Sequence, residues 1–284
     1  MKDEFGNLLT NKKEILDATV KHYTNVLRNR PIKDDLQNHQ TEREELATKR
    51  MELASKNVTP DWDMEELEVV LKYLKKNKSK DALGYIYELF RPEVCGEDLK
   101  LAILKMMSLI KQKQEFPECL ELCNISSIFK RKGNKNEFGQ YRGIFRVLIF
   151  RAILERLIYN DEYSIIDQNL TDSNVGACKN RNIRDNLFVV TAILNSVKKG
   201  SEEAVDMCAY DVEKCFIALW TFECINDLFE AGLQNNKLTL LFKMNINAQV
   251  AVKTTQGMTD RVNIGNMIMQ GTVRWFKSSP LIFF

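Results

Sequence analysis

The chain has 284 residues, of which 44% are hydrophobic and 28% are charged. This composition is ordinary for a globular protein and argues against a disordered chain. Lys and Arg total 41 against 39 Asp and Glu, so the net charge of +2 gives no global case for nucleic-acid binding. Any such case must rest on local clusters of basic residues.

The cysteines and the N-terminal sequence indicate the compartment. Seven cysteines without a Cys-x-x-Cys pair point to reduced thiols rather than to a disulfide framework, and two histidines argue against a zinc site. The N-terminus has no apolar signal-peptide region, and no stretch approaches the roughly 18 apolar residues of a membrane span. We therefore expect an intracellular protein, nuclear or cytoplasmic and not secreted, without a membrane partner.

The first 60 residues are polar and predict a helical connector. An amphipathic segment contains Ile15 and Tyr23, and a stretch rich in Gln, Glu and Arg covers residues 36–56, so we expect helices with a thin apolar face. Residues 61–200 are predicted to be mainly helical. Apolar stripes at helical spacing are expected to form its core. The stripes are Met64, Leu67, Leu71 and Leu74; Leu99, Ile103, Met106, Met107 and Ile110; Phe145, Ile149, Ile153 and Leu157; and Ile183, Leu187, Val190, Leu194 and Val197.

Strand-like patterns interrupt and follow these helices. Residues 123–129 are short and partly β-branched, so they predict a strand that leads into the basic turn 130–135. Apolar residues alternate over 205–209, which predicts a second strand running up to Asp211.

The last part of the chain is predicted to contain two helices and a hairpin. The helices are expected around 222–229 and 236–244, and alternation on both sides of a polar turn at 255–260 predicts the hairpin. The expected fold class is therefore α+β, with a helix-rich N-terminal part and antiparallel strands later.

Basic residues form two local clusters. The clusters are Lys72, Lys75, Lys76, Lys78 and Lys80, and then Lys130, Arg131, Lys132 and Lys135. Either cluster could be a solvated helix end or loop, or part of a local surface that binds nucleic acid.

Asp211 carries the most functional information in the chain. It follows the alternating segment 205–209, and the aromatic Phe216 stands five residues later. A carboxylate that leaves an apolar strand ahead of an aromatic suits a polymerase that holds Mg²⁺ and excludes a nucleotide 2′-hydroxyl. The alternative interpretations are a carboxylate that caps the next helix and an aromatic that belongs to the core.

Short segments spread along the chain form an ordered set. They are residues 4–15, 77–84 (Asn-Lys-Ser-Lys-Asp-Ala-Leu-Gly), 128–130 (Ile-Phe-Lys), 140–144 (Gln-Tyr-Arg-Gly-Ile), 174–176 (Asn-Val-Gly), 209–216 (Ala-Tyr-Asp-Val-Glu-Lys-Cys-Phe) and 269–271 (Met-Gln-Gly). In this order they resemble the reverse transcriptase of non-LTR (LINE-like) retrotransposons. Each segment is a weak signal alone, and the ordered set carries the resemblance.

The resemblance implies a right-hand polymerase fold that holds Mg²⁺ at its palm. Asp211 would bridge two Mg²⁺ ions, with the carbonyl of Val212 as a further oxygen ligand. Phe216 would stand under the sugar and reject a ribose 2′-hydroxyl by its bulk.

The same resemblance assigns nucleotide contacts, with an RNA template, a DNA primer and deoxynucleotides as partners. Lys130 and Arg142 would be fingers residues that grip the triphosphate. Gln270 would contact the nucleotide, and Gly271 would let the backbone approach the primer terminus. The alternatives are surface solubility for Lys130 and a loop-fixing salt bridge for Arg142.

The implied division of the chain has four parts. Residues 1–60 would be the connector, 61–200 a fingers-like region, 201–273 a partial palm and 274–284 a divergent tail. The tail matches nothing in the family, and we expect it to reflect a frameshift or a misassigned exon end.

The chain also departs from the family where the chemistry is decided. Ile217 stands where an Asp is usual, and no aromatic-x-Asp-Asp follows Asp211 before Phe284. One carboxylate cannot position two metal ions roughly 3.5–4 Å apart, so we expect weak or absent Mg²⁺ binding and no polymerase activity. The alternatives are a non-catalytic RNA-binding module and an element remnant without function. The oligomeric state is not predicted.

Overall fold

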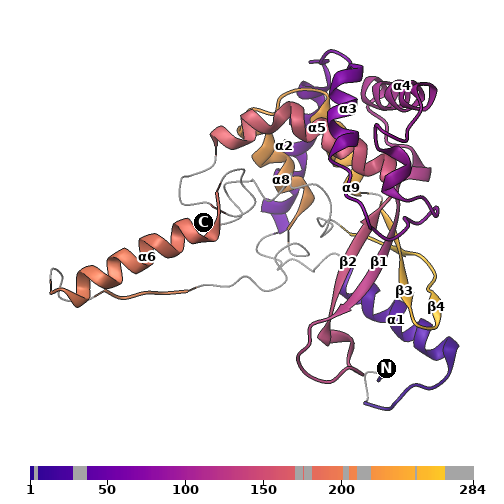
Figure 1. Cartoon of the computed structure of the whole chain (residues 1–284). Helices are drawn as coiled ribbons and strands as arrows, with labels where there is room; N and C mark the ends of the chain where they lie inside the picture. Colours follow the sequence, from indigo (N-terminus) through magenta and orange to yellow (C-terminus); the bar gives the residue numbers. More distant parts are fainter. Residues whose placement is uncertain are drawn as a thin grey trace.

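The computed structural model describes residues 1–2, 6–27, 37–169, 175, 181–200, 205–209, 219–246 and 248–265. The described part is a mixed α+β fold, which confirms the expected fold class at that level. Most helices gather at one end of the molecule, and a small sheet with one helix against it forms the other end (Figure 1).

Two helices come from the predicted N-terminal connector. Helix α1 (Lys12–Leu27) buries Tyr23 and Leu27 against the sheet. Helix α2 (Gln37–Ser55) buries Ala47, Met51 and Ala54, and it packs on helices from the far end of the chain. These are α8 (Thr221–Glu230) and α9 (Lys237–Ile246), which form where helices are predicted.

Three further helices build the main core. Helix α3 (Met64–Lys72) begins at a capping box, in which Asp63 and Glu66 satisfy each other's backbone N–H groups. Helices α4 (Glu97–Lys113) and α5 (Ile149–Gln168) complete the group, and short 3₁₀ turns lie at Tyr87–Phe90, Glu118–Leu120 and Phe138–Gln140.

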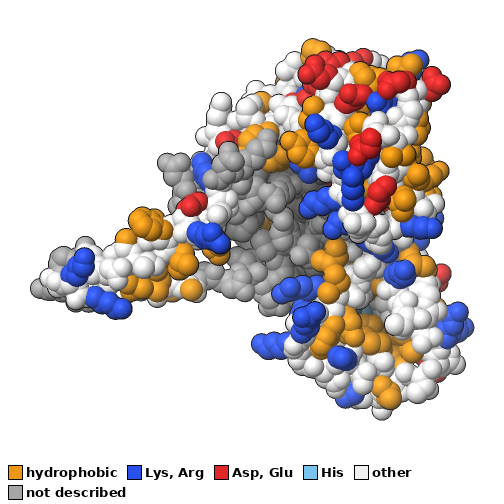
Figure 2. Space-filling view, in the orientation of Figure 1, with side chains coloured by type: hydrophobic (Ala, Val, Ile, Leu, Met, Phe, Trp, Pro, Cys, Tyr) orange, Lys and Arg blue, Asp and Glu red, His pale blue; other side chains and the backbone are white. Residues whose placement is uncertain are grey.

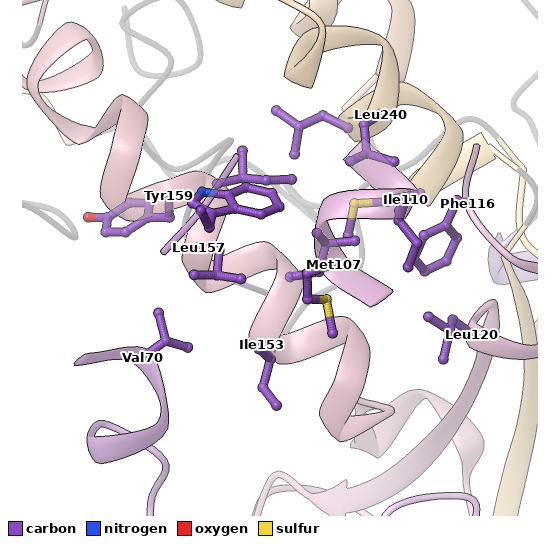
Figure 3. Close-up of a cluster of buried hydrophobic side chains, with 14 of the residues drawn as sticks. Val70, Met107, Ile110, Phe116, Leu120, Ile153, Leu157, Tyr159 and Leu240 are labelled. Atoms are coloured by element: carbon purple, nitrogen blue, oxygen red, sulfur yellow. The ribbon is translucent and has the colours of Figure 1, made fainter. Parts of the chain in front are cut away.

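Side chains from these helices meet in one apolar cluster. Figure 3 shows Val70 of α3, Met107 of α4 and Leu157 of α5 in that cluster, together with Leu240 of α9. The stripe residues Leu67, Leu71, Ile103, Met107 and Ile153 are all buried, as predicted. Removing such an area from water is the main stabilising contribution to the fold.

The sheet of the described residues has five strands, in the order β2-β1-β3-β4 with β5 also paired to β3. Strands β1 (Leu122–Phe129) and β2 (Tyr141–Val147) are antiparallel. Strand β3 (Gln249–Thr254) lies parallel to β1 and antiparallel to both β4 (Gly257–Met258) and β5 (Val262–Asn263). The predicted strand and hairpin are confirmed, and the parallel pairing is an addition to them.

Two residues of the predicted helical stripes differ from the prediction, one in its element and one in its burial. Phe145 belongs to β2, where it pairs with Ile125. Its distance of four residues from the apolar Ile149 fits a helix, but its distance of two residues from the apolar Val147 fits a strand equally well. Leu99 is 43% exposed. Its neighbour Lys100 takes the inward position instead, with its ammonium bonded to carboxylates of α3 and α4.

The predicted core stripe at residues 183–197 is a helix but is not core. Helix α6 (Ile183–Lys198) projects from the rest of the molecule in Figure 1, and none of its residues, all described, is buried. Ile183 is 78% exposed and Leu187 is 62% exposed. Periodicity reports that a helix has an apolar face, and it does not report which element covers that face.

The strand predicted at residues 205–209 is wrong. The structure describes these residues as exposed and without regular secondary structure. A strand is stabilised by its hydrogen bonds to a neighbour, and none of the described strands pairs with this segment.

Candidate nucleic-acid interface

The two faces of the sheet differ in how they are covered. Ile125 and Val250 lie on the face that α1 closes with Tyr23 and Leu27, and all four are buried in one cluster. Side chains alternate along a strand, so the residues between them belong to the opposite face. That face is only partly covered, and Ile128 on it is 54% exposed.

Three cationic side chains lie on the partly covered face, and we call the surface that they form the basic sheet face. Arg142 and Arg146 come from β2, and Lys253 comes from β3. The register places Arg142 opposite Ile128, while Lys253 and Ile144 flank Ser126 on its two sides. Arg142 and Lys253 are exposed, and Arg146 is half-buried.

A lysine-rich loop, residues 75–80, adjoins the basic sheet face. The Nη1 group of Arg146 donates to Ser79 Oγ at 2.9 Å and lies 3.5 Å from the backbone oxygen of Lys80. All six residues of the loop are exposed, and four of them are lysines. In Figure 2, Lys and Arg side chains gather around the region of β1 and β2, whereas Asp and Glu gather mainly over α3 and α4.

A buried carboxylate fixes the end of this loop. Asp81 is 8% exposed, and its Oδ1 accepts hydrogen bonds from the backbone N–H groups of Leu83 and Tyr85, both at 2.9 Å. Its Oδ2 accepts from the N–H of Ile149 at 3.2 Å, where α5 begins. The loop is therefore attached to the helix that follows β2, which holds the lysines beside the sheet.

The structure brings Lys130 and Arg142 to the same end of the β1–β2 hairpin. Arg142 pairs with Ile128, two residues before Lys130. The Lys130 ammonium donates to the carbonyl of Gly139 at 2.8 Å, and its backbone N–H donates to that of Gln140 at 2.8 Å. Both cations are exposed, so the site can present positive charge to a ligand.

The remaining predicted site residues lie outside the described part of the chain. They are Asp211, Val212, Phe216, Gln270 and Gly271. Within the described ranges, no group of three or more His, Cys, Asp or Glu side chains is arranged to hold a metal ion. The Mg²⁺ site at Asp211 therefore stays a prediction.

An acidic pocket of about 260 Å³ lies between α3 and α5, away from the sheet. Its lining includes Glu65, Glu66 and Asp161. Asp161 is engaged in the fold, because it accepts from Trp62 Nε1 at 2.7 Å and pairs with Lys237 at 2.6 Å. These carboxylates would repel an anionic ligand, so the candidate interface is the basic sheet face.

Sequence reasoning missed Arg146 and Lys253. A signal for Arg146 was present, because it lies four residues after Arg142 and alternation puts both on one face of a strand. Lys253 could not be found in the same way. Its place beside Ser126 depends on the parallel pairing of β1 with β3.

Comparisons with known proteins add no assignment to this geometry. No family model matches the chain, and no curated protein sequence matches it. Within the described ranges, no helix is long and apolar enough to cross a membrane.

Proposed function

We propose that this chain binds RNA through the basic sheet face, as the fingers-like portion of a non-LTR reverse transcriptase. We also propose that residues 1–284 do not polymerise DNA by themselves. The observation that carries the proposal is the grouping of Arg142, Arg146 and Lys253 on one partly covered sheet face beside a loop with four lysines. Cations that neutralise phosphates release condensed counterions, which drives binding to nucleic acid.

The segments that resemble the family supply much of this surface. Residues 77–84 contain two of the loop lysines and Asp81, and residues 140–144 contain Arg142. The resemblance was drawn from sequence alone, whereas the grouping comes from strand register and hydrogen bonds. The grouping of cations therefore supports a surface that contacts phosphate groups, and the segments that resemble the family supply part of it.

The charge pattern favours RNA binding over nucleotide chemistry. An arginine fork binds phosphate oxygens in pairs, and lysines add point charges along a strand. Phosphoryl transfer also requires carboxylates that hold metal ions, and the sequence supplies Asp211 without the later Asp pair. We therefore infer a binding function that does not depend on catalysis.

Fluorescence anisotropy with a labelled single-stranded RNA tests the binding. The double variant Arg142→Ala/Lys253→Ala removes two exposed cations of the site. We expect it to weaken binding at least several-fold, and to lower the slope of log affinity against log salt by about 0.7 for each lost phosphate contact. The matched control is Lys49→Ala/Lys105→Ala, which removes two exposed cations of α2 and α4.

Two outcomes contradict the binding proposal. One is the absence of salt-dependent RNA binding by the unsubstituted chain, which would favour a remnant without function. The other is an equal loss in both double variants, which would assign the binding to net charge rather than to this surface.

A primer-extension assay with Mg²⁺, primer-template and deoxynucleotides tests the second half of the proposal. We expect no extension above that of the Asp211→Ala variant, because a single carboxylate cannot position both metal ions. Extension that disappears in Asp211→Ala would show that a carboxylate from elsewhere completes the site.

A further inference from the structure

Ser79 stands at the junction between the lysine-rich loop and the basic sheet face. It is exposed and belongs to no helix or strand, so its hydroxyl can be reached from solvent. The hydroxyl oxygen accepts a hydrogen bond from Arg146 Nη1 at 2.9 Å. A group attached to this oxygen would therefore lie against a guanidinium of the proposed RNA site.

The residues around Ser79 are strongly basic. Lys78 and Lys80 flank it, and Lys75 and Lys76 lie a few residues before it. Many protein kinases choose substrates by the charge pattern around the acceptor hydroxyl, and a run of lysines before a serine suits a kinase with an acidic substrate groove. Exposure, irregular backbone and local charge all fit an acceptor site.

We propose that Ser79 is a phosphorylation site that switches off RNA binding by the basic sheet face. The inference rests on the proposed function for its consequence. In the reaction, the Ser79 hydroxyl oxygen forms a bond to the γ-phosphorus of a nucleoside triphosphate, and the bond to the β-phosphate oxygen breaks. The nucleoside diphosphate leaves, and the hydroxyl proton passes to a base of the kinase.

The geometry explains why the phosphate would act as an inhibitor. A phosphoserine carries a charge of roughly −1.5 to −2 and three acceptor oxygens. At this position it would pair with Arg146 and draw in the neighbouring lysines, through ion pairs that are stronger than the present hydrogen bond from Arg146 to an uncharged hydroxyl. Its oxygens would take the place of an RNA phosphate.

Arg146 has donor capacity for this contact. Its Nε is buried, and it has no hydrogen-bond partner within the described structure. A buried donor without a partner costs free energy, and a phosphate held beside the guanidinium could accept from it. A phosphate oxygen would also be a stronger acceptor for the Arg146 guanidinium than the hydroxyl of Ser79 is.

The test compares RNA affinity before and after modification of the full chain. A kinase that prefers basic substrates would be used with ATP, and the acceptor would be located by mass spectrometry. We expect phosphate on Ser79, and we expect no phosphate on the peptide that contains residue 79 in the Ser79→Ala variant. The phosphorylated chain should bind labelled RNA about tenfold or more weakly, because the added charge cancels roughly two favourable phosphate contacts.

Three variants separate the switch from other effects. Ser79→Glu should weaken RNA binding, while Ser79→Ala should bind nearly as tightly as the unsubstituted chain, since it removes one hydrogen-bond acceptor of Arg146 and adds no charge. Ala102→Glu adds the same charge to an exposed position of α4 and should leave RNA affinity unchanged. Far-ultraviolet circular dichroism would check that all three are folded.

The possible failures are distinguishable. If the unmodified chain does not bind RNA, the proposed function fails. If it binds RNA, and the phosphorylated chain and Ser79→Glu bind equally well, the switch is wrong while the proposed function stands. Absence of phosphate on Ser79 after the kinase has modified a control peptide with the sequence of residues 75–82 would also overturn the inference.

Discussion

Arg43 of α2 and Glu223 of α8 form a paired hydrogen bond that spans most of the chain. Arg43 Nε donates to Glu223 Oε2 at 2.7 Å, and a second guanidinium nitrogen contacts the other carboxylate oxygen. Nearby, Arg50 of α2 pairs with Glu230 of α8 at 2.7 Å. Helix α2 is therefore attached to α8, late in the chain, by ion pairs as well as by packing.

The first prediction is that Glu223→Gln lowers the free energy of unfolding by about 0.5–1 kcal/mol, because the pair is partly exposed and is screened by solvent. Glu230→Gln is the matched control and should cost less, since 47% of the Glu230 side chain is exposed. Urea unfolding at low and high salt would measure both. An equal loss of unfolding free energy in the two variants would show that the Arg43–Glu223 pair is no more stabilising than the Arg50–Glu230 pair.

The same pair predicts a pH dependence. Burial alone would raise the pKa of Glu223, but the hydrogen bond and charge of Arg43 more than offset it, so the pKa is lowered. Its stabilisation is therefore complete above the unfolded value and is lost as the pH falls through the lowered folded value. Below the ordinary carboxyl range, the unfolding free energies of the native chain and Glu223→Gln should converge.

The second prediction concerns the contact between α1 and β2. A methyl group added at Gly143 would lie 3.1 Å from a ring carbon of Tyr23 and 3.2 Å from Ile125, so Gly143→Ala should destabilise the fold by about 1–3 kcal/mol. Gly139→Ala is the control, because its added methyl meets nothing within 4 Å. Thermal unfolding would compare them. A neutral Gly143→Ala would show that α1 can move away from the sheet at little cost.

The third prediction concerns the carboxylate that anchors the lysine-rich loop. Asp81→Ala leaves three backbone N–H groups without their acceptor, so it should cost about 2–3 kcal/mol in unfolding free energy. Asp17→Ala is the control, because Asp17 is exposed on the surface of α1. Chemical denaturation of both variants gives the comparison. A similar small effect for each would mean that the Asp81 contacts do not hold the loop.

The fourth prediction uses the different burial of two cysteines. Burial raises the pKa of the Cys123 thiol to about 12, whereas Cys119 is exposed. A maleimide at neutral pH should modify Cys119 quickly and leave Cys123 unmodified until the protein unfolds. Peptide mass spectrometry at successive times would follow both sites. Fast labelling of Cys123 under native conditions would contradict the packing of β1 against α1.

Much of the secondary structure follows from local periodicity. The helices that contain Leu67, Met107 and Ile153 form where apolar spacing predicts them, because their stripes face one core. The spacing of Phe145 satisfies both the helical and the strand period, so the pattern predicts a helix where the structure has a strand. The pattern also predicts Leu187 in the core, because local periodicity does not report what covers a helix.

The candidate site was predictable only in part. Lys130 and Arg142 were found through the family resemblance, and both lie at the same end of the hairpin. Arg146 and Lys253 depend on which strands are neighbours, and Ser79 depends on a contact between residues far apart in the sequence. Such long-range relationships leave no mark in the spacing of nearby residues.

The parallel pairing of β1 with β3 has a consequence for synthesis of the chain on the ribosome. Leu122 of β1 pairs with Gln249 of β3, so the hairpin of β1 and β2 is synthesised long before the strand that completes the sheet. A two-stranded hairpin is marginal alone, and the edge of β1 would stay open meanwhile. The nascent protein therefore has to pass through a stage in which one edge of β1 is available to other chains, and folding can finish only after translation has moved past residue 264.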